Sequence, residues 1–211
     1  MSNVLLDSEK AVFEIVRDYL NEKKAFDINK ILPIITSQFA KLSINVNITG
    51  IERILYSLVR KRILVEGSTL LRSDVLNNHK RNALYQYICN NPGNYLTQLE
   101  NKLNLSHHVT VWHLKTLIKF NFIEKQEFDN HDLFYATSED FSCVKMAYLT
   151  SNNGTILRYL KENDVGISKT QLSRDLGIHI ITIDKRLEIL MKHGLITREY
   201  IDNSYLYFIN E

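Results

Sequence analysis

The sequence is poor in proline, in cysteine and in long apolar runs. Its 211 residues include two prolines and two cysteines, and so few helix-breaking prolines favour a helical protein. Cys89 and Cys143 stand alone, without CxxC spacing, so we expect reduced thiols in a cytoplasmic protein. No apolar run approaches the ~20 residues that a membrane-spanning helix needs. Met1 to Asp7 show no basic segment followed by an apolar core, which predicts no secretory signal.

An excess of charge of one sign is also missing. The formal net charge is +2, and no segment is the basic block of a nonspecific nucleic-acid coat. Any DNA binding must therefore come from the local placement of a few basic side chains. The sequence also lacks a glycine-rich phosphate loop, GxSxG, HExxH and a cysteine placed beside a base. We expect neither an enzyme nor a resident cofactor.

What the sequence does contain is a repeat. The apolar residues of 99–135 recur 73 positions later without a gap. The matched pairs are Leu99/Leu172, Leu103/Leu176, Leu105/Ile178, Leu114/Leu187, Leu117/Leu190, Phe122/Leu195, Ile123/Ile196, Phe128/Ile201, Leu133/Leu206, Phe134/Tyr207 and Tyr135/Phe208. One apolar pattern used twice indicates one supersecondary unit built twice.

The first copy reads as three helices followed by a hairpin. Thr97 with Glu100 predicts a capping box at the second helix, Ser106 is expected to cap the third, and Asp129-Asn130 is a hairpin turn signal. Helices are expected at 80–90, 98–103 and 107–120, and strands at 123–128 and 133–137. In the second copy we expect a first helix at 155–162, a second capped by Ser168, a third at 182–193, and strands at 196–200 and 205–209.

The N-terminal third resembles a divergent further copy. We expect amphipathic helices at 8–23 and 29–42, with Pro33 tolerated in the first turn of the second. Ile51, Leu55 and Leu58 repeat the third-helix spacing, and 63–65 with 69–71 would form a short wing. The order helix, helix, turn, helix, hairpin is that of a winged helix-turn-helix. The predicted fold is therefore α+β and helix-dominated, with three tandem winged-helix units at 1–76, 77–138 and 151–211 and a connector at 139–150.

Two stretches carry a resemblance to a known family. They are Leu105-Ser106-His107-His108-Val109-Thr110-Val111-Trp112-His113-Leu114, leading to Asn121-Phe122-Ile123, and Ile178-His179-Ile180-Ile181-Thr182-Ile183-Asp184-Lys185-Arg186-Leu187, leading to Gly194-Leu195-Ile196. Both resemble the turn and recognition helix of prokaryotic winged-helix regulators of the ArsR/MarR type. Asn121 stands where that pattern commonly has glycine.

The resemblance implies a transcriptional regulator, in an archaeal cytoplasm, that binds double-stranded DNA sequence-specifically. In such proteins the third helix enters the major groove and the wing touches the backbone. The residues expected to contact DNA are Thr49, Arg53, Arg60, Lys61, Arg62, Ser106, His107, His108, Val111, Lys115, Lys119, His179, Thr182, Lys185 and Arg186. A homodimer is expected, through the apolar face of 8–23 or through 141–149. An effector pocket between units would make the regulator ligand-gated.

Two features favour a different function. The wings carry acidic residues that would repel phosphate (Glu124, Glu127, Asp129 and Asp132 on one, Glu199 and Asp202 on the other). Trp112 lies where base-reading side chains are usual, and packing against a protein suits it better. The alternative is therefore a protein–protein scaffold of the ESCRT-II type or an accessory subunit of transcription or chromosome machinery, since winged helices serve both purposes. Five histidines fall in 77–138, but no cysteine or spaced carboxylate completes a set, so no metal site is expected.

Overall fold

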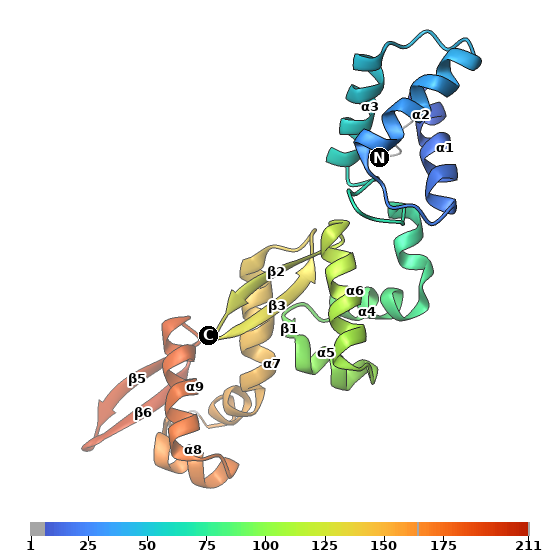
Figure 1. Ribbon diagram of the computed structural model, residues 1–211. Coiled ribbons are helices and arrows are strands. Elements are labelled where there is room, and N and C mark those ends of the chain that lie inside the picture. Colours follow the sequence, from blue (N-terminus) through green and yellow to red (C-terminus); the bar gives the residue numbers. More distant parts are fainter. Residues whose placement is uncertain (1–6, 164, 211) are drawn as a thin grey trace. The chain divides into compact units, whose positions relative to one another are not determined.

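The chain divides into two compact units, residues 1–138 and 139–211. The computed structural model describes residues 7–163 and 165–210. The expectation of no secretory signal concerned Met1 to Asp7, and residues 1–6 lie outside the described ranges. Helices dominate, and each unit adds one small three-stranded antiparallel sheet (Figure 1). The helix-dominated α+β class is thus confirmed. Among the described residues, no helix has the length and apolar character needed to cross a bilayer.

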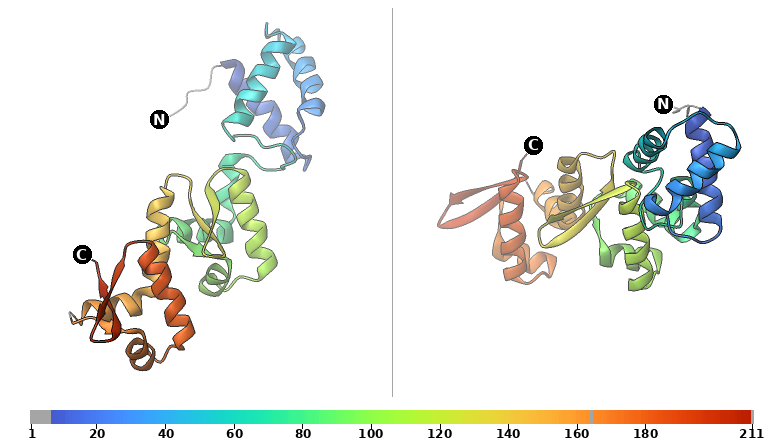
Figure 2. Two further views of the ribbon diagram at one scale, coloured as in Figure 1. Left: turned by 90° about the vertical axis from the view of Figure 1, so that its left-hand side faces the viewer. Right: turned by 45° about the horizontal axis from the view of Figure 1, so that its top comes forward.

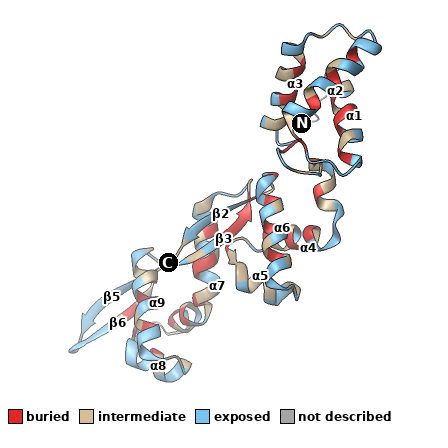
Figure 3. Cartoon of the chain, viewed as in Figure 1, coloured by how far each residue is buried: buried red, intermediate tan, exposed pale blue. Residues whose placement is uncertain are grey.

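Three helices of the first unit enclose a core of their own: α1 (Asp7–Asn21), α2 (Ile28–Lys41) and α3 (Ile48–Arg60). Buried residues of α1, α2 and α3, coloured red in Figure 3, form one apolar cluster. The expectation that the apolar face of 8–23 forms a dimer contact is therefore wrong, because the fold already covers that face. Pro33 lies in the second turn of α2, not the first, so the helix forgoes one backbone hydrogen bond to Asn29 there.

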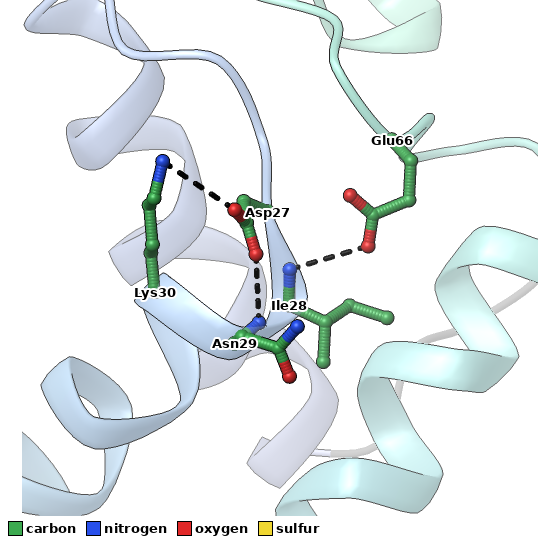
Figure 4. Close-up of polar contacts among 5 residues, drawn as sticks. All are labelled: Asp27, Ile28, Asn29, Lys30 and Glu66. Carbon is green, nitrogen blue, oxygen red and sulfur yellow. Dashed lines mark hydrogen bonds and ion pairs between the residues drawn. The ribbon is translucent and has the colours of Figure 1, made fainter.

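The predicted wing at 63–65 and 69–71 does not form. Residues 61–71, all of which the structure describes, contain no strand. Their polar groups bond to the start of α2 instead: the amide of Gly67 donates to the carbonyl of Phe26 at 2.8 Å, and the amide of Phe26 donates to Ser68 at 2.8 Å. Glu66 accepts a hydrogen bond from the Ile28 amide at 3.2 Å, beside the N-terminal cap of α2 formed by Asp27 (Figure 4). The segment is therefore a loop held against α2.

The rest of the first unit contains the first copy of the repeat. Its elements are η1 (Arg72–Asn77), α4 (His79–Asn90), β1 (Asn94–Tyr95), α5 (Leu96–Leu103), α6 (His107–Lys119), β2 (Ile123–Phe128) and β3 (His131–Ala136). The sheet order is β1-β3-β2. The capping box expected from Thr97 and Glu100 is wrong, since α5 begins at Leu96. The amide of Tyr95 donates to the Gln98 side chain at 3.3 Å, and Glu100 faces α6.

The second unit repeats this order. Its elements are α7 (Phe141–Lys161), β4 (Ile167–Ser168), α8 (Lys169–Leu176), α9 (Ile180–Lys192), β5 (Ile196–Ile201) and β6 (Ser204–Ile209), and the sheet order is β4-β6-β5. Both hairpins turn on an Asp-Asn pair with positive φ, at Asp129-Asn130 and Asp202-Asn203, as predicted. Figure 2 shows the β2–β3 hairpin beside α6 and the β5–β6 hairpin beside α9.

Most of the predicted connector at 139–150 is helical, because α7 begins at Phe141 and runs unbroken to Lys161. The side-chain amides of Asn152 and Asn153 donate to the carbonyls of Tyr148 and Leu149 at 2.9 and 3.0 Å. These bonds stay inside the helix, so the Asn-Asn-Gly stretch does not end it. Val144, Tyr148 and Leu149 are buried, which removes these three side chains from the second surface expected to form a dimer, whereas Met146 is 42% exposed.

The third helices α3, α6 and α9 end in the same way. A left-handed residue follows each helix, and the next amide donates back to a buried leucine five residues earlier. The left-handed residues are Arg62, Asn121 and Gly194, and the bonds run from Ile63 to Leu58, from Phe122 to Leu117 and from Leu195 to Leu190 at 2.9–3.0 Å. The carbonyls of Ile63, Phe122 and Leu195 then accept hydrogen bonds from backbone amides further along the chain, those of Arg72, Thr137 and Asn210 respectively. The N-terminal segment therefore shares this local frame although it has no strand.

Candidate nucleic-acid interface

On α3, the predicted residues lie at the surface. Thr49, Arg53 and Arg60 are exposed along the helix, and Arg62 is exposed just after it. Lys61 is exposed too, but its ammonium lies 3.8 Å from the carboxylate of Glu9. This side of α3 is therefore basic, with one of its charges already shared with α1.

On α6, the outward face combines basic and aromatic side chains. Ser106 is the N-cap, and its carbonyl accepts from the amide and the hydroxyl of Thr110 at 3.0 Å. His107 is exposed with its Nδ1 2.8 Å from Glu100 Oε1. The remaining predicted residues are His108, Lys115 and Lys119, which are exposed, and Val111, which is half-buried.

Trp112 is 56% exposed, although one side of its ring is covered from within. The guanidinium of Arg81, on α4, lies 4.9 Å from the ring centroid. Arg81 is itself 2% exposed and donates to the carbonyl of Val75 at 2.7 Å. Burial lowers the pKa of Arg81. Sequence reasoning missed this residue, because nothing in the local pattern of α4 marks an arginine that packs beneath another helix.

His113, next to Trp112, belongs to the interior. It is 3% exposed, and its Nδ1 has no hydrogen-bond partner within the part of the chain that the structure describes. Burial, followed by the positive charges of Arg81, Lys80 and His79, lowers the pKa of His113. The buried imidazole of His113 is therefore expected to be neutral.

On α9, the predicted residues again lie on the outer side. His179 caps the helix through its ring nitrogen, which accepts from the Ile181 amide at 3.3 Å. Thr182 and Lys185 are exposed and Arg186 is half-buried. Lys169 on α8 pairs with Asp184 on α9 at 2.8 Å, and this pair raises the pKa of Lys169. Sequence reasoning missed Ile181, which is 59% exposed on the same helix.

The two hairpins have one geometry and different chemistry. Glu127 faces Asp132 across the first hairpin, and Lys125 is paired with Asp132 at 2.8 Å. The corresponding residues of the second hairpin are Tyr200, Tyr205 and Arg198, with Arg198 4.4 Å above the Tyr205 ring. At these three positions the first hairpin thus presents two carboxylates and a lysine, whereas the second presents an arginine and two tyrosines, although Glu199 and Asp202 also place carboxylates on the second hairpin. This difference is visible in the sequence when the two copies are aligned at their offset of 73 residues, but we did not predict it.

The predicted residues fall into three sets, one on each third helix. A groove of 270 Å³ brings part of the α6 set against the loop at 67–70. Within residues 7–163 and 165–210, no three His, Cys, Asp or Glu side chains converge as a metal ion would require.

Comparison with known proteins adds one informative relative. No family model matches the chain. The chain is 30% identical over 154 residues to an uncharacterized HTH-type transcriptional regulator of Methanocaldococcus jannaschii. The match covers 72% of this chain but 39% of the relative, so the chain spans about two fifths of the relative's length.

A solved structure also matches, more loosely. It is the multiple antibiotic-resistance repressor MarR of Listeria monocytogenes, at 13% identity and a TM-score of 0.28, over 80% of this chain and 99% of that one. A TM-score this low carries no argument about function. The M. jannaschii relative is named a transcriptional regulator. The resemblance predicted from the sequence is confirmed: the chain is similar to a helix-turn-helix transcriptional regulator.

Proposed function

We propose that this protein is a sequence-specific double-stranded DNA-binding regulator of transcription, built from three tandem winged-helix units and acting in the cytoplasm. The N-terminal copy, at 1–76, would be a divergent one that has lost its wing strands. The shared ends of α3, α6 and α9 support three copies, because the same backbone bonds recur at Leu58, Leu117 and Leu190. The similarity to an archaeal HTH-type regulator supports the function.

One observation carries the proposal: unpaired lysines lie on the outer side of rigid third helices. Lys115, Lys119 and Lys185 are exposed, and none forms an ion pair among the described residues. Each helix is anchored by buried leucines, Leu114 and Leu117 in α6 and Leu187 and Leu190 in α9. Exposed cations on a fixed helix can contact phosphates while neighbouring side chains reach base edges in the major groove.

The hairpins refine the expected contacts. The carboxylates of Glu127 and Asp132 would repel phosphate, so the first hairpin is not expected to touch the backbone. Arg198 on the second hairpin, stacked on Tyr205, can donate to a phosphate from an ordered position. The proposed DNA contacts are therefore those of the third helices α3, α6 and α9, together with the second hairpin.

A protein-binding scaffold is the second candidate, and one observation favours it. Trp112 and Ile181 are the most exposed apolar side chains of α6 and α9, and apolar groups on a reading helix suit a protein partner as well as thymine methyl groups. The homodimer stays a prediction, although the fold already covers the apolar face of α1, which was one of its two expected contact surfaces. Analytical ultracentrifugation measures it.

Selection from random-sequence duplexes tests the proposal. The protein should enrich a defined motif, and His108→Ala or Lys185→Ala should reduce that enrichment. Enrichment of no motif, together with retention of a protein partner by the wild type but not by Trp112→Ala, would favour the scaffold.

A further inference from the structure

The groove beside α6 has two walls from different parts of the first unit. The loop at 67–70 forms one, and Trp112, Lys115 and Lys119 on α6 contribute to the other. Its volume is 270 Å³, and no acidic side chain is among the residues that line it. The groove is therefore basic, and it has an aromatic surface.

The loop wall is held in place. Gly67 and Ser68 are bonded to the backbone of Phe26, and Glu66 to the amide of Ile28 (Figure 4). Gly67 has φ +67°, and a Cβ added there would lie 3.9 Å from Lys119 Nζ. The left-handed backbone favours glycine at this position, whereas 3.9 Å to Lys119 Nζ is an ordinary van der Waals distance. Thr69 is exposed, and its amide and hydroxyl donate no hydrogen bond to any residue the structure describes.

The helix wall is held as well. Arg81 lies against one side of the Trp112 ring, and its bond to Val75 fixes the guanidinium. The tryptophan is still 56% exposed, so part of an oriented aromatic surface faces solvent at the groove. Lys115 and Lys119 follow on the same side of α6, one turn apart, where side chains four residues apart are neighbours.

We propose that this groove binds a nucleotide, with an unstacked base against Trp112 and its phosphate between Lys115 and Lys119. An aromatic platform beside lysines is how proteins bind unpaired nucleotides. Bases within a duplex are stacked on each other and offer only their edges to a protein, so duplex DNA cannot make the stacking contact. The volume lies just below the range of roughly 300–1,000 Å³ usual for ligand pockets, which suits one nucleotide better than a larger cofactor.

Nucleotide binding would compete with duplex DNA at α6, because Lys115 and Lys119 belong to both sites. This competition rests on the proposed function, whereas nucleotide binding does not. The nucleotide would act as an effector that occupies the reading helix itself.

Fluorescence titration tests nucleotide binding directly, since Trp112 is the only tryptophan in the chain. Adenosine monophosphate and thymidine monophosphate should change its emission saturably, with affinities checked by calorimetry. Adenosine alone and inorganic phosphate alone should each bind about tenfold more weakly, because charge-assisted hydrogen bonds and stacking both contribute. Lys115→Gln with Lys119→Gln should weaken nucleotide binding by about tenfold or more. Lys102→Gln, an exposed lysine of α5 outside the groove, should leave it unchanged.

Three results separate the possibilities. Binding of mononucleotides assigns the groove to free nucleotides, and binding only of a short single-stranded oligonucleotide assigns it to an unpaired strand. Absence of both, or equal affinities for adenosine and its monophosphate with no effect of the two lysine variants, would overturn the proposal. Duplex DNA binding by the same preparations is measured in parallel. Loss of nucleotide binding with duplex binding retained would contradict only the groove proposal, whereas absence of duplex binding would contradict the proposed function.

Discussion

The guanidinium of Arg81 lies 4.9 Å from the ring centroid of Trp112, which joins a buried cation of α4 to an exposed aromatic of α6. Arg81 also donates to the carbonyl of Val75 in η1. One side chain thus connects three elements beneath the proposed reading helix.

Replacing Arg81 should therefore weaken the first unit. Arg81→Leu removes the hydrogen bond to the buried Val75 and the contact with Trp112. We expect a loss of about 1–3 kcal/mol in the free energy of unfolding. Urea denaturation followed by Trp112 emission measures it, because that emission reports on the first unit alone. Arg174→Leu, an exposed arginine on α8, is the control; equal stabilities of Arg81→Leu and wild type would contradict the role of the arginine.

Acid should destabilise the first unit through His113. Burial and nearby positive charges lower its pKa in the folded unit, whereas the unfolded chain takes up a proton near a pKa of about 6.5. The contribution is therefore fully present above pH ~6.5 and is lost as the pH falls from there towards the folded pKa. Denaturation between neutral and mildly acidic pH should show a steeper loss for the wild type than for His113→Leu. If the free energy of unfolding fell equally with pH for the wild type and for His113→Leu, His113 would take up its proton equally well in the folded and the unfolded chain, which would contradict this prediction.

Backbone strain after α9 can be isolated at Gly194. Its φ is +69°, and a Cβ there would meet nothing within 4 Å. Gly194→Ala should therefore cost about 1–2 kcal/mol from the left-handed backbone alone. Gly154→Ala, in the interior of α7 and also without neighbours, should instead stabilise by about 0.5–1 kcal/mol. Thermal denaturation by circular dichroism compares the two, and effects of the same sign would refute this explanation.

Gly166 combines positive φ with a close neighbour. A Cβ there would meet the Phe208 ring, at a φ of +72°. Gly166→Ala should therefore destabilise the second unit by roughly 2–4 kcal/mol, more than Gly194→Ala. Adding Phe208→Leu to Gly166→Ala should recover part of the loss if the ring is the obstacle. If the double variant were no more stable than Gly166→Ala in thermal denaturation, the left-handed backbone alone would account for the loss of stability.

Local chemistry explains which parts of the fold were predictable. Asp129-Asn130 and Asp202-Asn203 adopt the turn that their residue types favour, and Ser168 caps α8 through its side chain. The apolar repeat likewise places the third helices correctly. These features depend on neighbours in sequence.

Features that depend on distant partners were not predictable in the same way. The loop at 61–71 forms no strand because Phe26 and Ile28, far along the chain, take its hydrogen bonds. The early start of α7 is a different case, because the bonds from Asn152 and Asn153 are local to the helix, and the expected helix at 155–162 simply began too late. Of the candidate site, exposure of the lysines followed from helix periodicity, whereas the Arg81 contact and the groove required the fold.

Duplex binding across a salt series tests the central claim most directly. Genomic fragments and random duplexes are titrated with wild type, Lys185→Gln and Lys102→Gln. Affinity of the wild type should fall steeply with salt, and Lys185→Gln should reduce the slope of log affinity against log salt by about one unit. Lys102→Gln should follow the wild type. No binding of any duplex at low salt would contradict the claim that the third helices read DNA.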